Sequence, residues 1–182
     1  MLVGEVPEAI LEMEGTYPLP EAQLDRFFFK LVVPYPSADD LSEILRRTTT
    51  NLEPVAHRVA DGPTIEAMGQ LARDVPVAAH VMDFVVRLTM ATHPHNAGAS
   101  ASIRDYVQVG VSPRGAQAIV LGAKIRALFE DRPNASIEDV LYVAKPALRH
   151  RLILNFNAVA DRVQADEIVD RLLETVPESA VV

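Results

Sequence analysis

An arginine stands at the start of a predicted helix, where the helix dipole disfavours a cation. Ser112 is a preferred N-cap residue and Pro113 suits the first helical position, so Arg114 lies in the first turn. A cation there costs from a few tenths to about 1 kcal/mol, whereas a helix N-terminus attracts phosphate. Arg114 is therefore either a group that meets an anion or an exposed arginine whose unfavourable interaction is screened by solvent.

Arg26 is the second candidate, because it is the only basic residue between Met1 and Phe29. The stretch around it is acidic and includes Glu21 and Asp25. From the residues alone, the favoured interpretation of Arg26 is an ion pair with one of these carboxylates.

Other groups that could do chemistry have simpler explanations. His93 and His95 have the spacing of a loop or strand pair, but no third ligand stands near them in the sequence, so an exposed loop is favoured over a metal site. Glu138 and Asp139 are explained as first-turn acids of a helix. No Gly-x-Ser-x-Gly pattern of a hydrolase occurs, so an independent enzyme has almost no support.

Composition excludes several classes of protein. The chain has 182 residues, a net charge of −8 and no cysteine, which argues against a nucleic-acid surface and excludes disulfides and thiol catalysis. The basic cluster at residues 149–151 is expected to complement a helix C-terminus or form an ion pair. Glu5 and Glu8 oppose a signal peptide, and no apolar run is long enough for a bilayer. We expect a cytoplasmic protein with no membrane partner.

The apolar pattern predicts a mainly α fold, a helical bundle built from consecutive helices with short links. Helices are predicted after Ser37 and Thr64, from about Val77 to Thr92, from Ser112 to about Asp131, after Ser136, and from Asp166 to Thr175. Residues 96–102 are expected to form a loop and residues 155–164 a connector. Phe84, Phe129 and Phe156 are expected in the core.

Residues 27–33 are aromatic and β-branched and end at Pro34, which predicts a short strand. Such a strand would have an unpaired edge and exposed aromatic side chains. The prolines at 34 and 36 mark a domain boundary, dividing the chain into residues 1–36 and 37–182. We expect the second part to fold without the first, because its apolar stripes can pack against one another.

Three segments, in order, resemble the MoxR-type AAA+ ATPases. They are Gly15-Thr16-Tyr17-Pro18-Leu19-Pro20-Glu21-Ala22-Gln23-Leu24-Asp25-Arg26-Phe27, the stretch from Asp105-Tyr106-Val107 to Ser112-Pro113-Arg114, and Ala147-Leu148-Arg149-His150-Arg151-Leu152. In that family the first segment follows the sensor-1 strand and the others belong to the C-terminal lid. The resemblance runs from about residue 12 to about residue 154, and it implies a helical lid after a short remnant of the α/β core.

The resemblance also implies roles for the two arginines. Arg26 matches the arginine finger, which reaches into a neighbouring subunit's nucleotide site, with Asp25 orienting it at rest. Arg114 matches the sensor-2 arginine, which contacts the phosphates of nucleotide in its own subunit. The family uses ATP and Mg²⁺, works as a ring that is usually hexameric, acts as a chaperone or in metal insertion, and often has partners with von Willebrand factor A domains.

The family's phosphate-binding parts do not occur in the sequence. No Gly-x-x-x-x-Gly-Lys-Ser/Thr loop is present, and neither a strand ending in Asp-Glu nor the sensor-1 Asn precedes residue 12. We therefore expect the C-terminal part of an ATPase module, inactive alone, which contributes Arg26 and Arg114 to a larger assembly. The alternative is a non-catalytic helical interaction module that has lost nucleotide chemistry.

Overall fold

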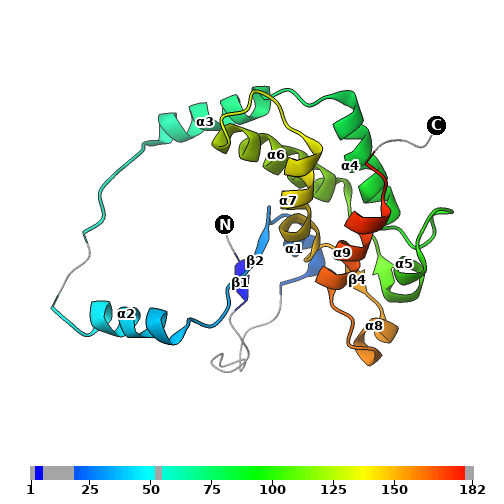
Figure 1. The fold of residues 1–182 in the computed structure, drawn as a ribbon, viewed down its shortest axis with the longest axis horizontal. Coiled ribbons are helices and arrows are strands. Elements are labelled where there is room, and N and C mark those ends of the chain that lie inside the picture. Colours follow the sequence, from blue (N-terminus) through cyan, green and yellow to red (C-terminus); the bar gives the residue numbers. More distant parts are fainter. Residues whose placement is uncertain (1–2, 6–18, 52–54, 179–182) are drawn as a thin grey trace.

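The computed structural model describes residues 3–5, 19–51 and 55–178, and this part of the chain is mostly helical (Figure 1). The helices are α1 (Glu21–Leu24), α2 (Ala38–Thr48), α3 (Gly62–Asp74), α4 (Ala79–Ala91), α5 (Ala101–Tyr106), α6 (Pro113–Phe129), α7 (Ile137–Leu148), α8 (Phe156–Ala160) and α9 (Ala165–Thr175). The strands are β1 (Val3–Glu5), β2 (Lys30–Val32), β3 (Val107–Val109) and β4 (Ile153–Leu154). The mainly α fold class is confirmed.

The centre of the fold is the pair α6 and α7, against which α4 and α9 pack. The predicted stripe of α4 is confirmed, because Phe84, Val85 and Leu88 are fully buried. Ile119 of α6 and Val140 of α7 are buried beside them. Burial of these aliphatic and aromatic side chains is the main source of stability for the helical body.

The strand after Arg26 is shorter than predicted and is not isolated. β2 covers Lys30–Val32 and pairs in parallel with β1, with Val3 opposite Lys30. Phe28 and Phe29 are half-buried against the helical core rather than exposed, because Gly122 of α6 leaves room for the Phe29 ring. Most of the acidic stretch expected before Arg26 lies outside the described residues.

Six short elements were not predicted: β1, α1, α5, β3, β4 and α8. β1 and α1 precede the predicted strand, α5 begins within the expected loop and β3 follows α5, while β4 directly precedes the expected connector and α8 lies within it. β3 pairs antiparallel with β4, so these segments form a small ribbon beside the helices. The prediction that Phe129 and Phe156 are core residues is wrong, because their side chains are 83% and 82% exposed.

Helix α2 stands apart from the helical body (Figure 1). The helix predicted after Ser37 begins with a capping box, in which the Ser37 hydroxyl accepts from the Asp40 amide and the Asp40 carboxylate accepts from the Ser37 amide. Its apolar face, which includes Ile44 and Leu45, is exposed to solvent.

Among the described residues, no helix is both long and apolar enough to span a bilayer.

Candidate functional site

Helix α6 begins as its sequence predicts. Ser112 is extended at φ −68° and ψ 166°, Pro113 occupies the first turn, and the Ser112 hydroxyl accepts from the Arg114 amide at 3.2 Å. Gly115 is required one residue later, because a Cβ there would lie 2.1 Å from Val111 Cγ1. The cap and this close contact fix the position of Arg114 relative to the preceding chain.

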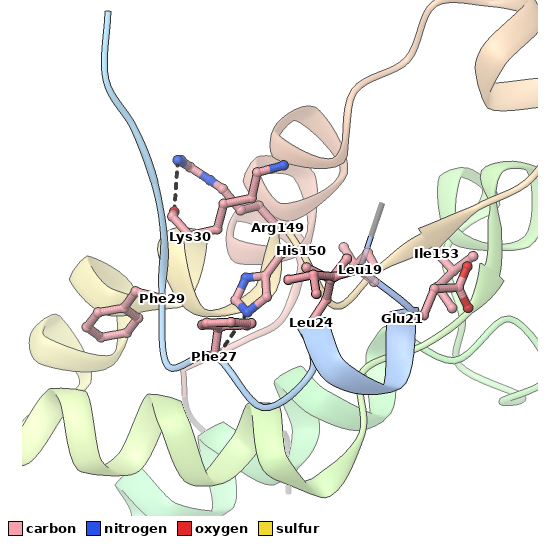
Figure 2. Close-up of a pocket in the computed structure, with 10 residues that line it drawn as sticks. Leu19, Glu21, Leu24, Phe27, Phe29, Lys30, Arg149, His150 and Ile153 are labelled. Carbon is pink, nitrogen blue, oxygen red and sulfur yellow. Dashed lines mark hydrogen bonds between the residues drawn. The ribbon is translucent and has the colours of Figure 1, made fainter. Parts of the chain in front are cut away.

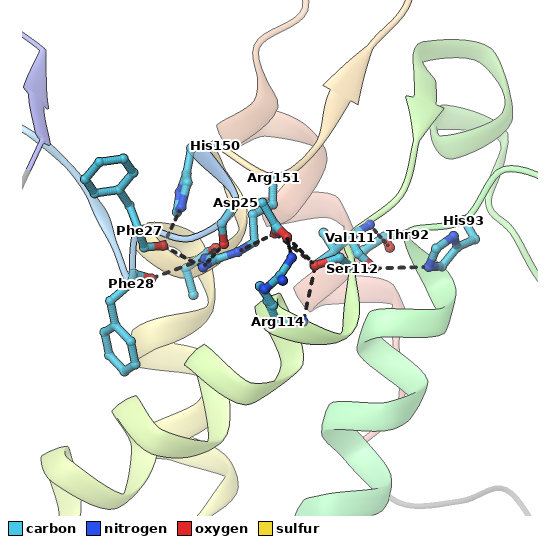
Figure 3. Close-up of polar contacts among 11 residues, drawn as sticks. Asp25, Phe27, Phe28, Thr92, His93, Val111, Ser112, Arg114, His150 and Arg151 are labelled. Atoms are coloured by element: carbon cyan, nitrogen blue, oxygen red, sulfur yellow. Dashed lines mark hydrogen bonds and ion pairs between the residues drawn. The ribbon is translucent and has the colours of Figure 1, made fainter. Parts of the chain in front are cut away.

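One carboxylate, that of Asp25, joins the start of α6 to the loop that carries Arg26 (Figure 3). It accepts from the Ser112 hydroxyl at 2.9 Å and from Arg114 Nη1 and Arg151 Nε, each at 3.2 Å. Burial alone would raise the pKa of the Asp25 carboxyl. The hydrogen bonds from Ser112 and Arg114 and the charge of Arg151 outweigh burial, so the pKa lies below its ordinary value.

Arg114 is held by this carboxylate but remains accessible. Its side chain is 55% exposed, whereas that of Asp25 is 18% exposed. A negative charge beside a helix N-terminus is favourable, so Asp25 offsets the unfavourable position of the arginine. The planar guanidinium suits phosphate oxygens as well as carboxylates, and more than half of the Arg114 side chain is open to solvent.

Arg26 lies one residue from Asp25, with its side chain exposed. Among the described residues its side chain has no hydrogen bond or ion pair, so the ion pair favoured from local sequence does not form there. Asp25 does not orient it either, because that carboxylate binds Ser112, Arg114 and Arg151. Arg26 lines an open hollow of about 650 Å³, together with Phe27 and Phe28.

Arg151 is the functional candidate that sequence reasoning missed. Its predicted ion pair exists, with Asp25, but its side chain is only 2% exposed and also donates to carbonyl oxygens around Arg26. A basic residue between Leu148 and Leu152, both buried, was the available signal. Burial lowers the pKa of Arg151, and Asp25 opposes that shift.

The two residues before Arg151 hold the same N-terminal segment (Figure 2). His150 Nε2 lies 3.0 Å from the Phe27 carbonyl oxygen, and Arg149 Nη1 donates to the Lys30 carbonyl oxygen at 3.4 Å. Arg149 also pairs with Asp166 at 2.9 Å, the kind of ion pair predicted for this cluster. Burial lowers the pKa of His150, partly opposed by the bond to Phe27. Arg149 and His150 also border a cavity of about 520 Å³ beside α1.

The remaining candidates have structural contacts. His93 Nε2 lies 3.2 Å from the Val111 carbonyl oxygen, so this ring supports the chain just before α6. No group of three potential metal ligands occurs within residues 3–5, 19–51 and 55–178. Asp139 completes the capping box of α7 with Ser136, as a first-turn acid should, and is fully buried.

Comparison with known proteins agrees with this architecture. The AAA lid domain family matches residues 99–172, most of the stretch from α5 to α9. The chain is 35% identical over 91% of its length to "Chaperone MoxR1" of Mycobacterium tuberculosis, of which it covers 44%. It is 28% identical over 93% of its length to "Protein MoxR" of Paracoccus denitrificans, of which it covers 54%.

A solved structure extends the similarity to three dimensions. A candidate ATPase from Cytophaga hutchinsonii superposes with a TM-score of 0.83 at 30% identity, over 92% of this chain and 51% of its own. The chain spans about half the length of the curated relatives that it matches. The chain is therefore a MoxR-related AAA+ protein whose helical body carries the AAA lid domain.

Proposed function

We propose that the chain acts as the arginine-bearing and lid part of a MoxR-type AAA+ ATPase. Arg26 would serve as the arginine finger and Arg114 as the sensor-2 arginine, with ATP and Mg²⁺ held by a phosphate-binding core in the assembly. The observation that supports this is the Asp25 cluster. Within the described structure, the exposed and unpaired Arg26 follows Asp25 in the chain, and the half-exposed Arg114 contacts the Asp25 carboxylate.

The geometry favours one shared target for the two arginines. Asp25 contacts Arg114 at 3.2 Å and is adjacent to Arg26 in the chain. An arginine finger acts on a nucleotide held by a neighbouring subunit, and Asp25 joins the base of that finger to Arg114. We therefore propose that Arg114 acts on the neighbour's nucleotide together with Arg26, rather than on its own subunit's nucleotide as the family resemblance implies.

The chemistry is stabilisation of charge. In phosphoryl transfer, negative charge spreads over the γ-phosphoryl oxygens, and an arginine supplied from a neighbour raises the rate by about 10³ to 10⁵. Arg26 has no competing partner in the described structure and is free to do this. Arg114 must first exchange Asp25 for phosphate, so it would report whether nucleotide is present.

Subunit mixing separates the two assignments. An active ring would be built by joining an AAA+ phosphate-binding core ahead of this chain, and Arg26→Ala and Arg114→Ala subunits would each be mixed with subunits that lack a working phosphate loop. If both arginines act on the neighbour, both mixtures regain ATP turnover, because the loop-defective subunit supplies the arginines. If Arg114 serves its own subunit, only the Arg26→Ala mixture recovers.

The same rings test the whole proposal. Arg26→Ala should abolish turnover with nucleotide affinity nearly unchanged, because a finger acts mainly in the transition state. The matched control is Arg73→Ala, which removes an exposed arginine at the end of α3. If neither arginine at the Asp25 cluster affects turnover or binding, the nucleotide role is wrong.

A second candidate function is a helical interaction module, which the exposed apolar faces of α2 and α3 favour. Ile44 and Leu45 of α2 are 45% and 52% exposed, and Met68 and Leu71 of α3 are 56% and 57% exposed. Unpartnered apolar helix faces commonly bind another protein.

In the ATPase proposal the partners are other AAA+ subunits in a hexamer, acting in the cytoplasm on client complexes that include von Willebrand factor A domains.

A further inference from the structure

The buried guanidinium of Arg151 binds the backbone on both sides of Arg26. Nη2 donates to the carbonyl oxygens of Asp25 at 3.1 Å and Phe27 at 2.6 Å, and Nη1 donates to that of Phe28 at 3.2 Å. Nε donates to the Asp25 carboxylate, while within its own helix region Nη1 also donates to the Ala147 carbonyl oxygen. One side chain that follows α7 therefore binds three carbonyl oxygens, which lie on both sides of Arg26 in the chain.

These contacts constrain the backbone and leave the Arg26 side chain untouched. His150 adds a further contact to the Phe27 carbonyl oxygen, and Phe28 packs against the helical core. Arginine suits this task because its five donors form a planar fork, whereas lysine presents a single ammonium group. Hydrogen bonds that involve a charged group are also stronger than neutral ones.

We propose that Arg151 is a positioning residue for Arg26. It holds the loop of residues 25–28 at a fixed place on the lid, so that Arg26 projects from a rigid base. The catalytic consequence rests on the proposed function of Arg26, whereas the loop geometry does not.

The shared carboxylate gives this arrangement a specific property. Arg114 and Arg151 contact Asp25 through separate oxygens, Oδ2 and Oδ1 respectively. When Arg114 leaves for phosphate, Asp25 keeps its contacts with Arg151 and Ser112. The loop that presents Arg26 therefore stays fixed while Arg114 changes partner, and the two arginines can act in sequence.

The first test uses the chain itself and trypsin, which cleaves after Arg26. Cleavage requires the loop to open away from the lid. In Arg151→Lys we expect the Arg26–Phe27 bond to be cut about tenfold faster or more, because several charge-assisted hydrogen bonds are lost. Cleavage after Arg126, inside α6, should not change. The matched variant Arg149→Lys should accelerate cleavage of the Arg26–Phe27 bond much less than Arg151→Lys does, because Arg149 donates to this segment at the Lys30 carbonyl oxygen, at 3.4 Å, beyond the loop of residues 25–28.

Two results would overturn the positioning role. One is an unchanged cleavage rate at Arg26–Phe27 in Arg151→Lys. The other is equal acceleration at Arg126, which would show that Arg151 supports the whole fold rather than this loop. Neither result depends on whether Arg26 takes part in ATP hydrolysis.

The second test measures ATP turnover in the reconstituted ring. Displacing a catalytic group by about 1 Å can cost about 10²-fold in rate, so Arg151→Lys should lower kcat on that order with KM for ATP nearly unchanged. In an Arg26→Ala background the same change should add no further loss. A further loss of kcat in the double variant, or an unchanged kcat in Arg151→Lys alone, would refute positioning through Arg26. Unchanged turnover in Arg26→Ala alone would instead refute the proposed function.

Discussion

Asp139 is a buried carboxylate whose ionisation the fold should require. Its side chain is fully buried, and it accepts from both terminal nitrogens of Arg132, with Arg126 Nη1 at 3.4 Å. Burial would raise the pKa of Asp139. The hydrogen bonds from Arg132 and Ser136 and the charge of Arg132 outweigh it and lower the pKa from 3.8 to about 2.

The contribution of this ionisation to stability follows from the two pKa values. The folded-state pKa lies about 1.8 below the ordinary value, and one pKa unit corresponds to about 1.4 kcal/mol. Ionised Asp139 therefore adds about 2.5 kcal/mol to the free energy of unfolding. Because the folded-state pKa is lowered, this contribution is complete above the unfolded-state pKa near 3.8 and disappears as the pH falls through about 2.

Urea denaturation followed by circular dichroism measures this effect. Wild-type protein should lose stability steeply between about pH 5 and pH 2. Asp139→Asn should be less stable than wild type by about 2.5 kcal/mol near pH 7, and its free energy of unfolding should fall less on acidification. Glu138→Gln is the matched control, because its neighbouring carboxylate pairs with the same Arg126 but is 79% exposed. If Asp139→Asn matches wild type in both stability and pH dependence, the reasoning about this buried ion pair is wrong.

Three further predictions concern packing, folding and activity. Gly122→Ala should lower the free energy of unfolding by about 1–3 kcal/mol, because its Cβ would lie 2.8 Å from Phe29 Cζ. Gly69→Ala should instead stabilise the exposed helix α3, because nothing lies within 4 Å of its Cβ. Equal melting temperatures of the two variants would contradict this. A chain that begins at Ser37 should still melt cooperatively, but at a lower temperature than the full chain, because it leaves the guanidinium of Arg151 without its N-terminal partners; a non-cooperative melt in circular dichroism would oppose the division at residue 36. The isolated chain should show no ATP turnover above buffer, and magnesium-dependent phosphate release by pure protein would refute that expectation.

Local sequence predicted the parts of the fold that local interactions determine. The caps at Ser37, Ser112 and Ser136 all form, because each depends on a side chain and an amide within three residues. The placement of Arg114 in the first turn of α6 follows from the same rule. The roles of Arg26 and Arg114 in nucleotide chemistry remain predictions that rest on the family resemblance.

The features that were missed depend on contacts between distant residues. The N-terminal partners of Arg151 lie more than 120 residues earlier in the chain, so no spacing rule could indicate them. The helix α8 has only five residues, too few to show a period. Phe129 and Phe156 were assigned to the core by residue type alone, although each lies at the end of an element where the body provides no cover.

The unequal number of charges at the Asp25 cluster has a consequence for the encounter with ligands. One carboxylate faces two guanidinium groups, those of Arg114 and Arg151, and Arg26 follows directly in the chain. A positive potential is thus concentrated at one place on a chain whose net charge is −8. Such a field draws anions toward the cluster from solution and repels them from the acidic remainder. Because the Debye length is about 8 Å at physiological ionic strength, the capture of anions there should become slower as salt is added.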